Sequence, residues 1–358
     1  MGRPAKFVFP AFYFFSLTTF FASPVRGQIS KSADLNGESQ TKEMPVARNQ
    51  IRVGANEVVA AVTVSDKQGE PVLDLSQSDF YVLDNGIEQR IDHWDFGEEP
   101  FAVVLVIQTS AHVQSILPVV HRAGSIFTET VMALSGEAAM ITYDDTVDIR
   151  QPFTMDHAAV ETTIEKIASG SLGMRLYDAM SRANSLLQSQ PLSWRRVMLV
   201  IGEAQDSGSS SKLGEVLREA QLSNTSIYTI GVSSIAADLR YGPKRHRYFS
   251  PPPNGGADLG ALGMWLVELG TNEAHNHALE VSAAATGGTH YRTLKDKTIQ
   301  NALDNIGGEL HTQYNLSYQP SGDAQPGFHE IKVTVSRPGV TVRARPGYYL
   351  ARTGIEQK

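Results

Sequence analysis

Residues 103–115 read VVLVIQTSAHVQS. The apolar run Val103–Ile107 has the composition of a buried strand, and the polar residues that follow it indicate a strand-to-helix turn. In an open α/β sheet, ligands bind at such turns, outside the carboxyl ends of the strands. The stretch therefore predicts a central strand that delivers Gln108, Ser110 and His112 to one edge of a sheet.

Strand and helix patterns alternate on either side of this strand. The predicted strands are Ala102–Ile107, Ala138–Tyr143, Val197–Ile201 and Ser226–Gly231. The predicted helices are Val113–Leu134, Leu176–Leu187, Leu213–Leu222 and Thr298–His311. Such alternation predicts a mostly parallel sheet with helices on both faces. The stretch TVDIRQPF, residues 146–153, is expected to add an antiparallel edge strand.

Two β-rich segments flank this central pattern. The first holds the strand Glu57–Ser65 and then DFYVLDNGIEQRIDHW, in which Asn85-Gly86 is a strong hairpin signal. The second holds QYNLSYQP, HEIKVTVS and VTVRARPGYYL, which alternate polar and apolar residues between turns. A hairpin alone is marginally stable in water, so we expect the two segments to fold as one domain.

The whole-chain composition excludes several classes of protein. At 358 residues the chain is long enough for about two domains. Its net charge of -7 and pI near 5.8 argue against a nucleic-acid partner, which would require a basic face. The chain has no cysteine, which excludes a lipoprotein anchor, disulfides and thiolate metal sites.

The first residues have the pattern of an export signal. Arg3 and Lys6 precede the uncharged run FVFPAFYFFSLTTFFA, and Val25 and Gly27 are small residues at a cleavage position. We expect a signal peptide at residues 1–27, a flexible linker at residues 28–50 and a periplasmic or secreted protein without a membrane span after cleavage. An uncleaved membrane anchor is the alternative.

Seven stretches in the same order along the chain resemble a von Willebrand factor A-type protein. They resemble more narrowly the bacterial family of A-domain-related proteins first described from Acidobacteria. The stretches are VTVSDKQGEPVLDLSQSDFYVLDNGIEQRI, FAVVLVIQTS, LYDAM, RRVMLVIGEAQDSGS, ATGGTHY, QYNLSYQP and HEIKVTVSRPGVTVRARPGYY. The resemblance implies a doubly wound A domain, residues 98–311, inserted in a β-sandwich-like domain formed by residues 51–97 and 312–351.

The resemblance also implies a metal-ion-dependent adhesion site, in which Asp-x-Ser-x-Ser, a Thr and an Asp hold Mg²⁺. In this chain Gln108 and His112 replace the first Asp and the second Ser, and only Ser110 is unchanged. Met174 stands at the Thr position and Glu203 at the Asp position, with Asp206 close by. A thioether is a poor Mg²⁺ ligand, so we expect a degenerate site that binds no metal and uses no cofactor.

Other groups of polar residues have less specific patterns. His275–His277 read HNH, for which a zinc site with His290 or His246 is one interpretation and a solvated loop the favoured one. The long connection 232–277 includes RYGPKRHRYF, which is either a solvated charged loop or a surface for an acidic or aromatic partner. Gly287-Gly288 is expected to end a helix at positive φ.

These features predict an exported, non-enzymatic binding or adhesion module that recognises a protein partner. The expected binding face is the loop rim formed by Gln108–His112, Gly173–Arg175 and Glu203–Ser209. One alternative is a structural component of a cell-envelope assembly, in which the β domain binds and the A domain is a spacer. A weaker alternative is a hydrolase that uses Ser110 with His112 and Asp206, although QTSAH lacks the usual nucleophile-elbow glycines.

Overall fold

The computed structural model describes residues 57–97, 100–133, 136–191, 193–232, 277–293, 296–321 and 325–350. All of them belong to one compact unit, Gln50–Lys358. The predicted signal peptide, the predicted linker, the stretch RYGPKRHRYF, and His246 and His275 lie outside these residues. Within the described ranges, no helix is both long enough and apolar enough to cross a membrane.

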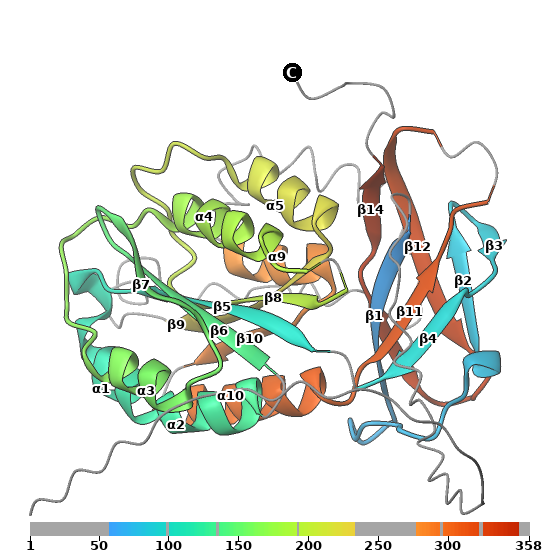
Figure 1. Cartoon of the computed structure of the whole chain (residues 1–358), viewed down its shortest axis with the longest axis horizontal. Helices are drawn as coiled ribbons and strands as arrows, with labels where there is room; N and C mark the ends of the chain where they lie inside the picture. The colour runs from blue at the N-terminus through green and yellow to red at the C-terminus, as the bar shows by residue number, and fades with distance from the viewer. Residues whose placement is uncertain are drawn as a thin grey trace, which may run out of the picture. The chain divides into compact units, whose positions relative to one another are not determined.

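A six-stranded sheet forms the middle layer of the α/β part of the unit (Figure 1). Its order is β10-β9-β8-β5-β6-β7, and every neighbouring pair is parallel except β6 and the edge strand β7. The strands are β5 (Phe101–Gln108), β6 (Gly136–Tyr143), β7 (Val147–Thr154), β8 (Arg195–Gly202), β9 (Thr225–Val232) and β10 (His290–Thr293). The predicted strands and the antiparallel edge strand are therefore present.

Helices cover both faces of this sheet, as Figure 1 shows. One face packs against α4 (Leu176–Gln188), α5 (Leu213–Leu222) and α9 (Ala278–Thr286). The other packs against α1 (Leu117–Arg122), α2 (Gly124–Ile126), α3 (His157–Glu165) and α10 (Asp296–Leu310). All eight residues of β5 are buried because Val103 and Leu105 enter one core and Val104 and Val106 the other.

The prediction of one continuous helix over Val113–Leu134 is wrong. Residues Ala111–Ile116 form a 3-10 helix, α1 and α2 are short, and Phe127–Met132 form a π-helix. Pro118 lies at the start of α1 and has no backbone N–H, so the α-helical hydrogen bonds cannot extend back through it. The apolar spacing is helical throughout, which is why the breaks are invisible in the periodicity.

Two four-stranded antiparallel sheets form a β-sandwich at the other end of the unit. Their orders are β13-β1-β11-β4 and β14-β12-β2-β3. The strands are β1 (Val58–Ser65), β2 (Phe80–Asp84), β3 (Ile87–Gln89), β4 (His93–Phe96), β11 (Tyr314–Tyr318), β12 (Gly327–Val335), β13 (Thr341–Ala344) and β14 (Gly347–Leu350), and a 3-10 turn spans Gln77–Asp79. Because β1 pairs with β11 and β13, and β2 pairs with β12, each sheet needs both ends of the chain.

The inner faces of the two sheets share one apolar core. Both β-rich segments contribute to it, since Val62 of β1, Val82 of β2 and Leu316 of β11 are all fully buried there. The β2–β3 hairpin turns at Asn85-Gly86, where both residues have positive φ, as the sequence predicts. The fold class expected from the sequence, a doubly wound and mostly parallel sheet inserted in a β-sandwich-like domain, is confirmed.

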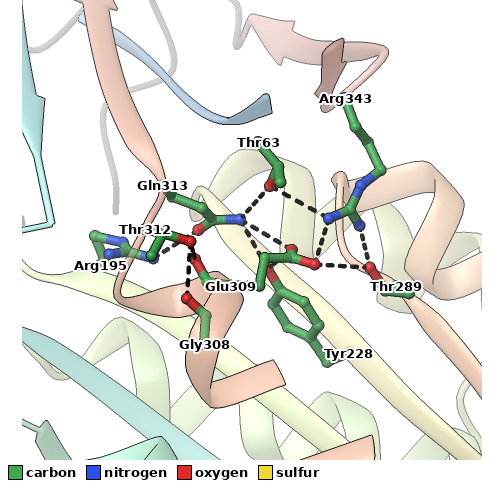
Figure 2. A network of polar contacts seen from close by, with 9 residues as sticks. All are labelled: Thr63, Arg195, Tyr228, Thr289, Gly308, Glu309, Thr312, Gln313 and Arg343. Atoms are coloured by element: carbon green, nitrogen blue, oxygen red, sulfur yellow. Dashed lines mark hydrogen bonds and ion pairs between the residues drawn. The ribbon is translucent and has the colours of Figure 1, made fainter. Parts of the chain in front are cut away.

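A buried polar network joins the α/β part to the sandwich (Figure 2). Glu309 of α10 forms an ion pair with Arg343 of β13 at 2.5 Å and accepts hydrogen bonds from Tyr228, at 2.5 Å, and Gln313, at 3.1 Å. Burial lowers the pKa of Arg343, but the charge and hydrogen bond of Glu309, together with Tyr228 and Tyr291, outweigh burial and raise that pKa. Thr63, Thr289 and Arg195 extend the network. Residues of the second sandwich segment and of the inserted domain are thus bonded to one carboxylate, and Thr63 of the first segment is linked to it through Gln313 and Arg343.

Candidate functional site

The predicted binding edge lies at the carboxyl ends of β5 and β8. The chain leaves β5 towards β6 on one side, and β8 pairs with β5 on the other, so the strand order reverses between β5 and β8. Such a reversal is where doubly wound folds place ligands. Gln108 is the last residue of β5 and Glu203 follows the last residue of β8, so the two side chains face this position.

The side chain of Gln108 links the cluster. Its Oε1 accepts from the Glu203 backbone N–H at 2.6 Å, and its Nε2 donates to Ser110 Oγ at 2.7 Å and to Glu203 Oε2 at 3.4 Å. A backbone N–H can only donate, which fixes Oε1 on that side of the amide. Gln108, Ser110 and Glu203 are 1%, 0% and 8% exposed. One amide therefore satisfies three buried polar groups.

This arrangement does not fit the Mg²⁺ ligation that the resemblance implies. Mg²⁺ requires oxygen ligands near 2.1 Å in octahedral geometry. The Gln108 oxygen is already bonded to a backbone N–H, and the amide nitrogen, which cannot bind a cation, faces Ser110 and Glu203. Among the described residues there is no group of three or more His, Asp or Glu side chains arranged to hold a metal ion.

The other predicted site residues have different surroundings. His112 is exposed on the 3-10 helix after β5. Met174 is half-buried, and its backbone forms a bridge with Ser207, whose N–H donates to Met174 O at 2.7 Å. Asp206 Oδ1 accepts from the Tyr177 backbone N–H at 3.0 Å and from Ser209 Oγ at 2.6 Å. The Asp206 carboxylate therefore fastens the loop after β8 to the first turn of α4.

Two carboxylates that the sequence analysis did not select, those of Asp144 and Asp145, lie against the loop 170–174. Asp144 Oδ2 accepts from the Ser171 N–H at 3.0 Å, and Asp144 Oδ1 accepts from the Thr146 N–H at 2.8 Å. Burial raises the pKa of Asp144, but these hydrogen bonds outweigh it and lower that pKa. A Cβ at Gly170 would lie 1.8 Å from Asp144 Oδ2, and one at Gly173 would lie 1.8 Å from Asp145 Oδ1. The pair Asp144-Asp145 directly after β6 was the signal in the sequence that could have identified these two carboxylates.

Tyr143 lies beneath the cluster. Its side chain is 1% exposed, and its hydroxyl has no hydrogen-bond partner among the described residues. Burial, and then the charges of Glu203 and Asp206, raise the pKa of Tyr143, so the phenol is neutral. A Cβ at Gly202 would lie 2.3 Å from this hydroxyl and 2.9 Å from Gln108 Oε1, which explains why glycine ends β8.

The loops above this buried cluster form the surface of the site. Leu172 is 69% exposed, a large fraction for an apolar side chain, and His112 is exposed as well. Asp178 accepts hydrogen bonds from the Ser210 and Ser211 N–H groups, at 3.0 and 2.9 Å, which holds the loop after β8. The rim is thus a set of loops held by carboxylates, with an apolar side chain on its surface.

The described part of the HNH stretch is the N-terminal cap of α9. His277 Nδ1 lies 3.4 Å from Glu280 Oε2, and His290 hydrogen-bonds through Nδ1 to Thr229 at 2.7 Å. Burial, with the charges of Arg292 and His277, lowers the pKa of His290 to about 4. Helix α9 ends at Gly287 with φ of 82°, as the sequence predicts for this glycine.

Comparison with known proteins gives similarity to solved structures only, because no family model and no curated protein matches the chain. The conserved hypothetical protein BatB from Bacteroides thetaiotaomicron is 14% identical over 59% of this chain and 98% of its own, with a TM-score of 0.42. The vWF domain of the type V pili tip protein Mfa5 from Porphyromonas gingivalis is 12% identical over 59% and 94%, with a TM-score of 0.40. A von Willebrand factor type A protein from Catenulispora acidiphila is 8% identical over 77% and 74%, with a TM-score of 0.45. The strand order of the sheets and the residues of the cores define the fold independently of these similarities.

Proposed function

We propose that this chain is an exported, non-enzymatic module of the von Willebrand factor A kind, related to the Acidobacteria-type family, that binds a protein partner. The binding face is the loop rim of Gln108–His112, Gly173–Arg175 and Glu203–Ser209, together with Leu172. The observation that carries the proposal is the Gln108 amide, which hydrogen-bonds Ser110 and Glu203 at the strand ends. Recognition then depends on the rim side chains.

Leu172 supports protein recognition because its exposed apolar side chain offers the rim an area that a partner would remove from water. The loop that carries it is held by Asp144, so its position is fixed before a partner arrives. A fixed loop loses little conformational entropy on binding, which favours affinity.

The partner test uses the mature full-length protein as bait in chemical crosslinking, with two matched variants. Leu172→Asp places a charge on the rim, and Ile87→Asp places the same charge on β3, where Ile87 is 61% exposed. We expect a partner that is lost with Leu172→Asp and kept with Ile87→Asp. The reverse pattern would support the alternative that the β-sandwich binds and the A domain is a spacer.

The contacts of Ser110 favour a non-enzymatic function over the hydrolase alternative. Ser110 is fully buried and its Oγ accepts from the Gln108 amide, whereas His112, the proposed base, is exposed. A serine nucleophile needs a base within hydrogen-bond reach. Turnover of a hydrolase substrate that is abolished in Ser110→Ala would overturn this part of the proposal.

Export to the periplasm or the medium rests on the signal-peptide pattern of residues 1–27. N-terminal sequencing of protein recovered outside the cytoplasm should begin at Gln28. Recovery of the full-length chain from the membrane would contradict cleavage.

A further inference from the structure

A cavity of about 80 Å³ lies at the end of the unit opposite the strand-top site. It lies between the outer face of the sheet β13-β1-β11-β4 and the amino ends of β8 and β9, and it is partly open to solvent. Asn315 of β11 contributes from the sandwich, and Arg196 of β8 and Gln221 of α5 contribute from the inserted domain. Arg345, just after β13, completes the group. We refer to it as the lower cavity.

Two buried guanidinium groups line the lower cavity, and neither has a carboxylate partner among the residues that the structure describes. Arg345 is 7% exposed and donates to Gly347 O, Val59 O and Asn224 Oδ1, which are all neutral. Arg196 is 7% exposed and donates to Ser223 O and Gln190 O, which are neutral as well. Burial lowers the pKa of Arg345 to about 10 and also lowers that of Arg196, so both remain cationic at neutral pH. Buried cations are normally paired with anions.

Polar atoms of both walls also lack partners within the described chain. Asn315 is 2% exposed, and neither its Nδ2 nor its Oδ1 makes a hydrogen bond. On β11 its neighbours Tyr314 and Leu316 enter the sandwich core, so Asn315 points to the opposite face, towards the cavity. Gln221 Oε1, Arg196 Nε and Arg345 Nη2 are buried and unpartnered in the same way. Burying such groups without a partner is unfavourable, so a ligand that pairs with them is favoured.

We propose that the lower cavity binds a small carboxylate that also carries a hydroxyl group. The carboxylate would accept from Arg345 Nη2, Arg196 Nε and Asn315 Nδ2, and the hydroxyl would donate to Asn315 Oδ1 or Gln221 Oε1. Glu57, a carboxylate on the lining, accepts from Ser317 Oγ, and the arginines keep the lining positive. A cavity of about 80 Å³ has room for a few waters or for one organic ion of a few heavy atoms.

The test is isothermal titration calorimetry and thermal unfolding of the mature protein with glycolate as probe, at constant ionic strength. Acetate, which lacks the hydroxyl, and ethylene glycol, which lacks the charge, are the comparison solutes. We expect saturable binding of glycolate, weaker binding of acetate, and no response to ethylene glycol or sodium chloride. No response to glycolate, or equal responses to glycolate and sodium chloride, would overturn the proposal and indicate that the cavity holds water.

Three variants tie the response to the lower cavity. Asn315→Asp places a negative charge against the ligand and should raise the glycolate Kd by at least about tenfold. Gln319→Glu adds the same charge at an exposed position near the end of the same strand and should leave the Kd unchanged. Asn315→Val removes the unpartnered amide, so it should fold at least as stably as the native chain and still lose the response. Native glycolate affinity in Asn315→Val would contradict the assignment, whether or not Asn315→Asp folds. This experiment does not depend on the rim binding a protein.

Discussion

Replacement of Gln108 by alanine tests whether its amide holds the strand-top cluster together. The native side chain is 1% exposed, with hydrogen bonds at 2.6 Å to the Glu203 N–H and 2.7 Å to Ser110 Oγ. In Gln108→Ala these two buried groups lose their partner, and Glu203 loses a contact to its carboxylate at 3.4 Å. No described polar side chain other than Gln108 bonds to the Glu203 N–H.

The expected loss follows from what the variant leaves unsatisfied. Each buried polar group without a partner costs about 1–3 kcal/mol, and each deleted buried methylene costs about 0.8 kcal/mol. We therefore expect Gln108→Ala to lower the free energy of unfolding by about 3–5 kcal/mol. That loss is a large part of the free energy of unfolding of a typical native protein.

Urea denaturation, followed by tryptophan fluorescence and circular dichroism, measures this loss. The matched control is Gln114→Ala, an exposed position on the 3-10 helix after β5, where we expect a change within about 0.5 kcal/mol. Ser110→Ala should fall between the two, because the Gln108 amide keeps its other partners. A loss below about 1 kcal/mol in Gln108→Ala would refute the linking function of the amide.

Three further predictions concern the rest of the molecule. The pKa of His290 is lowered to about 4, so as pH falls below 6.5 the unfolded chain takes up a proton that the folded chain excludes. Stability should then fall by about 2 kcal/mol between pH 7 and pH 5, and His290→Asn, which keeps a contact to Thr229, should reduce this dependence in urea titrations. Glu309→Ala leaves the buried Arg343 charge without its partner and should lower the free energy of unfolding by about 3–5 kcal/mol, whereas Glu309→Gln should lower it less. Equal stabilities of the two variants in thermal unfolding would be evidence against the ion pair. A chain truncated after Leu310 loses β11 to β14, so hydrogen exchange of residues 57–97 should become fast, and unchanged protection there would contradict the pairing of β1 with β11.

The periodicity of the sequence was sufficient to predict the sheets. The uniform apolar run Val103–Ile107 predicted a strand buried on both faces, and the alternating flanks predicted strands with one apolar face on a core. Asn85-Gly86 specified a hairpin because its backbone takes up positive φ at little cost. The helix after β5 was mispredicted because a helical apolar spacing is retained through 3-10, α and π segments, and Pro118 was not weighed against it.

The candidate site was predictable only in part. The sequence places Gln108, Ser110 and Glu203 at neighbouring strand ends, and the structure shows them in contact. The direction of the Gln108 amide depends on a backbone N–H that is distant in the sequence, and no local pattern reports it. The carboxylates of Asp144 and Asp178 act on loops far along the chain, so their importance emerges from the tertiary fold.

The lower cavity was not visible in the sequence at all. Asn315 and Arg345 belong to the second sandwich segment, whereas Arg196 and Gln221 belong to the inserted domain. They meet because sandwich and insertion pack together, and an alternating strand such as YNLSY predicts only that Asn315 faces away from the core.

The most direct test of a metal-free strand-top site is differential scanning fluorimetry in EDTA and in millimolar Mg²⁺ or Mn²⁺. A ligand that binds only the folded state adds about 2.7 kcal/mol at one hundred times its Kd, which raises the melting temperature measurably. We predict no metal-dependent rise in the native protein, and a partial rise after Gln108→Asp, His112→Ser, Met174→Thr and Glu203→Asp together, which restore hard oxygen ligands. A metal-dependent rise in the native protein that disappears in Ser110→Ala would contradict the account.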